Sequence, residues 1–225
     1  MLETKHRRVG VFIDIQNMYY SARNLYGQKV NFLNIVKAAT GDQQLIRAIA
    51  YGVSTKTGDE TAFFEALHNV GIEVMTKDLL EYDSGQKKGD WDVGITIDIV
   101  RMCDMLDVVV LVSGDGDYVP VGEYVKGRGR IFQVMSFRES TSTRLVDFAD
   151  VYTNMSDDRG RFLISGGPSA GRPARRGEAS IDLTSVQDEA NNPANAHVIP
   201  SAAIAVVDEA RKPRRYTRSN RPQKT

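Results

Sequence analysis

Four aspartates stand where an acidic, oxygen-donating site would require them. Asp14 ends one apolar run, and Asp115 and Asp117 follow another within the sequence Ser-Gly-Asp-Gly-Asp. Asp92 opens the segment that leads into the second run. Carboxylates held close together repel one another, so a cluster of them usually requires a cation. An all-oxygen donor set favours a hard ion, Mg²⁺ or Mn²⁺, which supports phosphodiester hydrolysis by activating water and stabilising the leaving oxygen.

Apolar runs alternate with helix-like segments over most of the chain. Strands are predicted at Val9–Asp14, Leu45–Tyr51, Gly71–Thr76, Asp107–Val112 and Arg130–Met135. Helices are predicted after the first strand, to about Tyr26, and at Thr61–Val70, where apolar residues recur at helical spacing. This alternation is typical of an α/β protein, a parallel-sheet three-layer α/β/α sandwich with helices on both faces.

The segment from Trp91 to Leu106 fits two structures. Its first half alternates apolar and polar residues, which favours a strand. The apolar pattern continues to Leu106, too far for an ordinary strand. A parallel sheet also needs a crossover between the strands at 71–76 and 107–112. We therefore predict a helix.

The placement of the acids depends on strand order. Ligands of an open parallel sheet bind beyond the carboxyl ends of its strands. If the first and fourth predicted strands are neighbours, the four aspartates converge at that edge. Each also has a plainer explanation. Asp14 could cap a helix, Asp115 and Asp117 could form Asx turns, and Asp92 could be an acid favoured by a helix dipole.

Two further polar residues accompany the acids. Asn17 follows Asp14 by three positions and could be an ordinary residue of a first helical turn. Asp98 lies six positions after Asp92, about 240° around a helix, so the two need not share a face. We expect Asp98 to be a surface or supporting acid rather than a metal ligand.

Composition narrows the class of protein. The chain has 225 residues, one Cys and three His, which argues against a disulfide framework and against Cys- or His-based metal sites. No apolar run approaches the roughly 18 residues of a membrane span, and no secretory signal is recognisable. We expect a soluble, cytoplasmic protein without membrane association.

Charge is distributed unevenly along the chain. Residues 1–160 contain 18 Lys and Arg against 23 Asp and Glu, whereas residues 161–225 contain 11 against 6. A Gly/Pro-rich stretch begins near residue 166. We therefore predict a folded domain at 1–157 and a low-complexity, largely disordered basic tail at 158–225.

Three segments together resemble a known family. They are Phe12-Ile-Asp-Ile-Gln-Asn-Met-Tyr, Lys88-Gly-Asp-Trp-Asp-Val-Gly-Ile-Thr-Ile-Asp98, and Leu111-Val-Ser-Gly-Asp-Gly-Asp-Tyr-Val-Pro120. In order and spacing they are similar to the motifs of the NYN domain family, specifically its LabA-like branch. The resemblance covers about residues 8–155, with a looser match from Ser142 to Tyr152. It does not cover the tail.

The resemblance implies a PIN-like fold and a metal-dependent ribonuclease. By that likeness Asp14, Asp92 and Asp115 are the main metal-binding acids, Asp117 is the fourth, and Asn17 orients a water or a ligand. The implied cofactor is Mg²⁺ or Mn²⁺, the implied substrate is RNA, and a homodimer is a further expectation. Ile15-Gln16 departs from the small residues of many relatives, which could change how closely substrate approaches the first loop.

The leading hypothesis is an endoribonuclease that hydrolyses RNA phosphodiesters at the aspartate cluster. Candidate phosphate contacts are Lys87, Lys88, Arg128, Arg138 and the tail bases between Arg211 and Lys224. The main alternative is a non-catalytic regulatory module that binds RNA or protein and retains a vestigial acidic pocket. A phosphohydrolase of the haloacid dehalogenase type is disfavoured, because Gln16 stands where that class needs a second acid.

Overall fold

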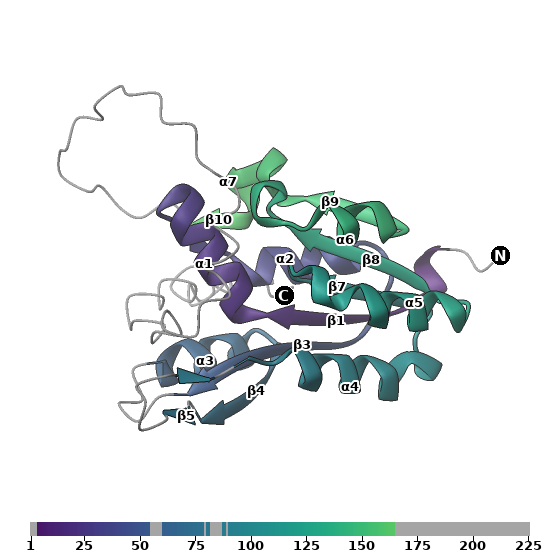
Figure 1. The fold of residues 1–225 in the computed structure, drawn as a ribbon, viewed down its shortest axis with the longest axis horizontal. Coiled ribbons are helices and arrows are strands. Elements are labelled where there is room, and N and C mark those ends of the chain that lie inside the picture. The colour runs from purple at the N-terminus through teal and green to yellow at the C-terminus, as the bar shows by residue number, and fades with distance from the viewer. Residues whose placement is uncertain (1–3, 55–59, 79, 82–86, 89, 165–225) are drawn as a thin grey trace, which may run out of the picture.

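The computed structural model describes residues 4–54, 60–78, 80–81, 87–88 and 90–164. Six strands form one sheet in the order β4-β3-β1-β7-β8-β9, and every neighbouring pair is parallel (Figure 1). The strands are β1 (Arg8–Asp14), β3 (Gln44–Ser54), β4 (Glu73–Asp78), β7 (Val108–Val112), β8 (Ile131–Ser136) and β9 (Val151–Asn154). Five of them match the predicted strands to within a few residues, and β9 is additional.

Helices cover both faces of the sheet and complete three layers (Figure 1). The helices are α1 (Ile15–Tyr26), α2 (Phe32–Thr40), α3 (Thr61–Asn69), α4 (Asp92–Met102), α5 (Val119–Gly127) and α6 (Thr143–Phe148). One core contains buried residues of α1, α2 and α3, and the other contains those of α4, α5 and α6. Alternate residues of β1 point into the two cores, Ile13 into the first and Phe12 into the second. The predicted α/β/α sandwich is confirmed.

The pair β1 and β7 forms the centre of the sheet. All five residues of β7 are buried, as are Val9 to Asp14 of β1. A strand that is covered on both faces is apolar at nearly every position, so its sequence is a continuous apolar run. Both strands could therefore be predicted from the sequence. Ile13 pairs with Val112, so both strands end at the same edge.

The ambiguous segment is a helix, as predicted. Ile95, Ile99 and Met102 of α4 are buried at the spacing i, i+4, i+7. They pack into the same core as Phe12 of β1. The crossover requirement of the parallel sheet therefore outweighed the local alternation.

Shorter elements complete the described chain. They are η1 (Thr4–His6), β2 (Lys29–Val30), β5 (Leu80–Glu81), β6 (Lys87–Lys88), η2 (Cys103–Met105), η3 (Gly116–Tyr118), η4 (Arg138–Ser140), η5 (Met155–Asp158), α7 (Arg159–Phe162) and β10 (Leu163–Ile164). Strand β10 pairs antiparallel with β2, and β5 pairs antiparallel with β6.

The folded part continues past the predicted start of the tail. Residues 158–164 form the end of η5, helix α7 and strand β10, and the Asp158 carboxylate accepts a hydrogen bond from the Arg161 amide. Phe162 and Leu163 are buried in the core shared with α1 and α2. The assignment of these seven residues to the tail is therefore corrected, because their apolar side chains pack on the body. Residues 165–225, where the rest of the tail was predicted, lie outside the described residues.

No helix among the described residues is long and apolar enough to cross a membrane.

Candidate active site

Sequence-distant acids come together beyond the carboxyl ends of β1 and β7. The order of strands reverses at this pair, because the chain first builds β3 and β4 on one side of β1 and then β7, β8 and β9 on the other. Asp14 ends β1, and Asp115 lies three residues past the end of β7. Ligands of doubly wound sheets bind at such a reversal point. The condition on strand order set by the sequence is met.

Asp14 is built into the start of α1. Its Oδ1 accepts a hydrogen bond of 3.0 Å from the Asn17 amide, so it is the N-cap of the helix. The side chain is buried, with 8% of the residue exposed. Burial raises the pKa of Asp14 to about 7, and the charges of Asp92 and Asp115 add to the rise. Asp14 therefore caps helix α1 and also lies close to other acids.

Tyr118 joins two of the acids. Its buried hydroxyl donates to Asp92 Oδ1 at 3.0 Å and lies 3.5 Å from Asp14 Oδ2. Burial raises the pKa of Asp92, as do the nearby charges of Asp115, Asp90 and Asp117, while the Tyr118 hydrogen bond opposes the rise. Tyr118 was not among the predicted site residues. Its only signal was its position directly after Asp117 in the third motif.

Asp115 and Asp117 form the turn after β7. Asp115 Oδ1 accepts from the Asp117 amide at 2.9 Å and caps η3. Ser113 Oγ in turn accepts from the Asp115 amide at 3.3 Å. Burial and the Asp117 charge raise the pKa of Asp115. Asp115 therefore forms an Asx turn and also lies near Asp14 and Asp92, whereas Asp117 is exposed at the rim.

Asn17 ties the two loops together. Its Oδ1 accepts from the Gly114 amide at 2.9 Å, linking the first turn of α1 to the loop after β7. Gly114 also accepts from the Ser142 amide at 2.9 Å, and a Cβ at Gly114 would lie 2.5 Å from the Ser140 carbonyl oxygen. Only glycine permits this close approach of backbone segments.

Asp98 lies apart from this group. Its carboxylate accepts from the Tyr51 hydroxyl at 3.1 Å and from Arg101 at 3.4 Å. Asp92 has a different partner, Tyr118, so the two acids of α4 do not share a hydrogen-bond partner. Within the structure Asp98 supports the packing of Tyr51 against α4.

The predicted phosphate contacts are distributed over both ends of the sheet. Arg138 is exposed directly after β8, at the same edge as the acids. Arg128 follows the end of α5 and pairs with Asp104, at the opposite edge. The side chains of Lys87 and Lys88 and the bases from Arg211 to Lys224 lie outside the described residues.

The donor set suits a hydrated hard cation. The groups that meet at the edge offer carboxylate oxygens, and the charges of Asp92 and Asp115 disfavour ionisation of Asp14, a cost that a cation would offset. No group of three or more His, Cys, Asp or Glu among the described residues is arranged to hold a metal ion by itself. Mg²⁺ usually takes only one or two carboxylates together with waters and substrate phosphates. The residues therefore fit an open site rather than a closed protein cage.

The fold and this edge define a class of protein. A parallel α/β/α sandwich with acids at the strand reversal is the arrangement expected of a PIN-like nuclease domain. The chain belongs to the NYN domain family, whose family description matches residues 8–156. Members of that family are generally ribonucleases.

Two relatives show how far the likeness extends. The chain is 28% identical over 160 residues to the low amplitude and bright protein LabA of Synechococcus elongatus, covering 68% of this chain and 86% of LabA. It is also similar to the crystal structure of a protein of unknown function from Vibrio parahaemolyticus. That likeness has a TM-score of 0.66 and 32% identity, and covers 73% of this chain and all of the other.

Proposed function

We propose that the protein is a metal-dependent endoribonuclease that hydrolyses RNA phosphodiesters with Mg²⁺ or Mn²⁺. The observation that carries the proposal is the convergence of Asp14, Asp92 and Asp115 at one edge, where Tyr118 contacts both Asp14 and Asp92 and the charge of Asp115 disfavours the ionisation of both. Groups with pKa values shifted by burial and by a specific partner are candidates for function. Membership of a family of ribonucleases supports the same conclusion.

The acids would hold the cation. Asp14, Asp92, Asp115 and Asp117 supply the oxygen ligands, with the exposed Asp117 at the rim. When bound, Mg²⁺ or Mn²⁺ would offset the charge of the scissile phosphate and lower the pKa of a water. Asp14 is held in place by its cap on α1 through Oδ1, and its Oδ2 lies 3.5 Å from the Tyr118 hydroxyl.

Three neutral or basic residues complete the proposed machinery. Tyr118 is a positioning residue, since its hydroxyl fixes Asp92 through a 3.0 Å hydrogen bond. The side-chain oxygen of Asn17 accepts a hydrogen bond from the Gly114 amide. Its side-chain nitrogen would donate to a water or to a phosphate oxygen. Arg138 stands at the same edge and would contact backbone phosphate. Contacts by Lys87, Lys88 and the tail stay predictions, as does the homodimer.

A second candidate function is a non-catalytic module that binds RNA or protein. The absence of a self-sufficient metal cluster among the described residues favours it, as does the Tyr118 hydroxyl already bound to Asp92. In that case the acids would serve only the local structure of the loops. The two functions differ in whether cleavage depends on a metal and on Asp115.

A cleavage assay separates these functions. Purified protein is incubated with an RNA of mixed single- and double-stranded structure, with Mn²⁺ or with EDTA. The variants are Asp115→Asn and, as a matched control, Asp42→Asn, an exposed aspartate before β3 at the opposite edge. The proposal expects cleavage with Mn²⁺, none with EDTA, none by Asp115→Asn, and full activity of Asp42→Asn. RNA binding without cleavage in every condition would instead support the module.

A further inference from the structure

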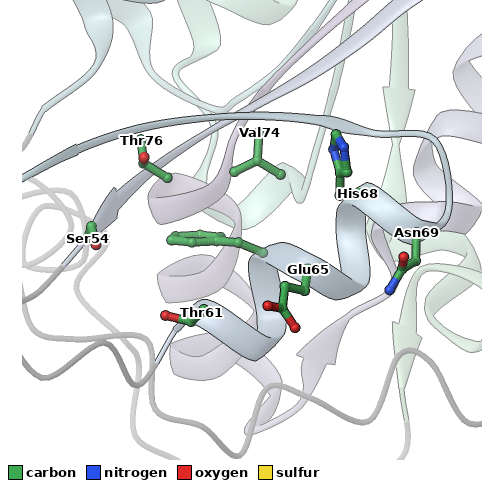
Figure 2. A pocket seen from close by; sticks show the side chains of 8 residues that line it. Ser54, Thr61, Glu65, His68, Asn69, Val74 and Thr76 are labelled. Carbon is green, nitrogen blue, oxygen red and sulfur yellow. The ribbon is translucent and has the colours of Figure 1, made fainter.

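A cleft lies between α3 and β4. It has a volume of about 530 Å³ and is lined by Thr61, Phe64, Glu65 and His68 of α3 and by Val74 and Thr76 of β4. Figure 2 shows Val74 and Thr76 on β4 beside helix α3, with His68 extending toward the strand and the Glu65 side chain pointing away from it in this view. Its volume is within the range of small-ligand sites. None of these residues takes part in the acidic site described above.

Phe64 reaches the cleft because β3 has a glycine beneath it. A Cβ at Gly52 would lie 2.8 Å from the Phe64 ring, so the ring rests on bare backbone. Phe63 and Leu67, on the inner side of α3, are buried, whereas Phe64 is half-buried and lines the cleft. The cleft thus offers an aromatic surface whose position is fixed by the strand.

Gly52 also connects the cleft to the acids. The same Cβ would lie 3.3 Å from Ile15, the residue after Asp14. The Trp91 indole donates to the Gly52 carbonyl at 2.7 Å, and Trp91 directly precedes Asp92. Strand β4 is two strands from β1, about 10 Å at the usual strand spacing. A short extended stretch of nucleic acid spans such a distance.

The chemistry of the lining favours a base over a phosphate. The Glu65 carboxylate would repel a phosphate, but it accepts hydrogen bonds from the amino and ring N–H groups of bases. His68 and Thr61 can bond to the edges of a base as well. Proteins that bind single-stranded RNA stack its bases on aromatic side chains, and Phe64 is the aromatic residue in this lining.

We infer that the cleft between α3 and β4 binds one nucleobase of a single-stranded RNA substrate, stacked on Phe64, close to the phosphodiester that is cleaved. The inference rests on the proposed ribonuclease function and adds to it a substrate class: single-stranded RNA with an unpaired base beside the cleavage point. Duplex RNA, whose bases are stacked and paired, cannot present one to the cleft.

An abasic scan tests the inference. A single-stranded RNA that wild-type protein cleaves at one mapped bond is made in versions that each lack one base near that bond. One position should raise KM about tenfold for wild type, the size of one stacking contact. Phe64→Leu should raise KM for intact RNA by a similar factor and should be insensitive to loss of that base. Phe148→Leu, a half-buried phenylalanine of α6, should behave as wild type.

The outcomes separate this inference from the proposed function. If wild type cleaves no RNA with Mn²⁺, the ribonuclease proposal fails. If it cleaves but Phe64→Leu keeps the wild-type response to every missing base, only the cleft inference is overturned.

A crosslinking experiment needs no variant and no cleavage. Single-stranded RNA carrying 5-iodouridine is irradiated with wild-type protein in EDTA, and the modified peptide is mapped. A crosslink at Phe64, within the tryptic peptide 57–77, is expected. Crosslinks confined to other peptides would overturn the inference.

Discussion

Aspartates lie at both ends of the central strand pair, β1 and β7. Those at the amino edge have cationic partners, whereas those at the carboxyl edge lie beside other acids. At the amino edge, Asp107 accepts from the Arg8 side chain at 3.0 Å through both carboxylate oxygens and from the Arg8 amide at 2.9 Å. Arg8 and Arg130 together lower the pKa of Asp107 to about 2. At the carboxyl edge, burial and neighbouring acids raise the pKa of Asp14 to about 7.

The difference concerns which acids receive a cationic partner. The ion pairs found among the described residues include Asp107 and Asp104 at the amino edge, and none includes Asp14, Asp92 or Asp115. An uncompensated buried carboxylate costs stability. Acids that have a cationic partner at one end of two strands, and none among the described residues at the other end, are candidates for binding a cation at the second end. This contrast supports the proposal that the amino edge serves stability and the carboxyl edge holds a ligand.

The largest expected contrast is in cleavage. Asp14→Asn should lower metal-dependent RNA cleavage on the order of 10²–10³-fold, as loss of a preorganised charge-stabilising group does. Asp107→Asn should leave the cleavage rate within about twofold of wild type, because Asp107 lies at the opposite edge of the sheet from the acids. A twofold change is far smaller than the loss expected for a charge-stabilising group. Initial rates with Mn²⁺ at a temperature where all proteins are folded provide the measurement. Equal losses in both variants would mean that the two edges do not divide function and stability.

The next contrast is in stability, where Asp107→Asn rather than Asp14→Asn should be the damaging substitution. Asp107→Asn should lower the free energy of unfolding by about 2 kcal/mol, because charged hydrogen bonds to Arg8 are lost while the site stays partly buried. Urea unfolding at pH 7 measures the change. Asp42→Asn, exposed and near the same edge, is the control and should be neutral. An unchanged midpoint for Asp107→Asn would show that this ion pair does not hold the edge.

The same pair makes a pH-dependent contribution of known sign. The folded-state pKa of Asp107, about 2, lies below its ordinary value of 3.8. The unfolded chain therefore binds the proton more readily, and stability from this group is present above pH 4 and is lost as pH falls towards 2. The stability difference between wild type and Asp107→Asn should shrink over that interval. A difference that is constant from pH 6 to pH 2 contradicts the assignment.

The comparison also indicates what the sequence can and cannot predict. Continuous apolar runs identified β1 and β7, because a strand buried on both faces has no polar alternation. The acids after them were recognisable from position and from the resemblance to a family. Whether β1 and β7 are neighbours was only a condition at that stage, since strand order depends on contacts between distant segments. The sheet topology shows that β1 and β7 are neighbours.

Residues that act through long-range contacts escaped prediction. Tyr118 is a buried donor to Asp92, 26 positions away, and nothing in the local sequence indicates that partner. In the sequence, Phe64 is one of several apolar residues that recur at helical spacing in the predicted helix Thr61–Val70. Adjacent helix positions differ by about 100°, so Phe63 and Phe64 point in different directions. The Phe64 ring can line the cleft because residue 52 of β3 is a glycine, which leaves room for it. Such features require the assembled sheet.

The smallest expected effect is a gain in stability at the carboxyl edge. Asp14→Asn keeps the helix cap, because asparagine accepts from the Asn17 amide as well as aspartate does. It removes a buried charge beside Asp92 and Asp115. In EDTA at pH 8 the variant should be more stable by about 1 kcal/mol, or roughly 2–4 °C in Tm for a domain of this size. Scanning calorimetry or urea unfolding measures it, and a loss of stability would mean that the Asp14 charge itself holds the edge together. Because the same substitution should lower cleavage on the order of 10²–10³-fold, a stabilised protein with that loss would show that this cluster is retained at a cost to folding.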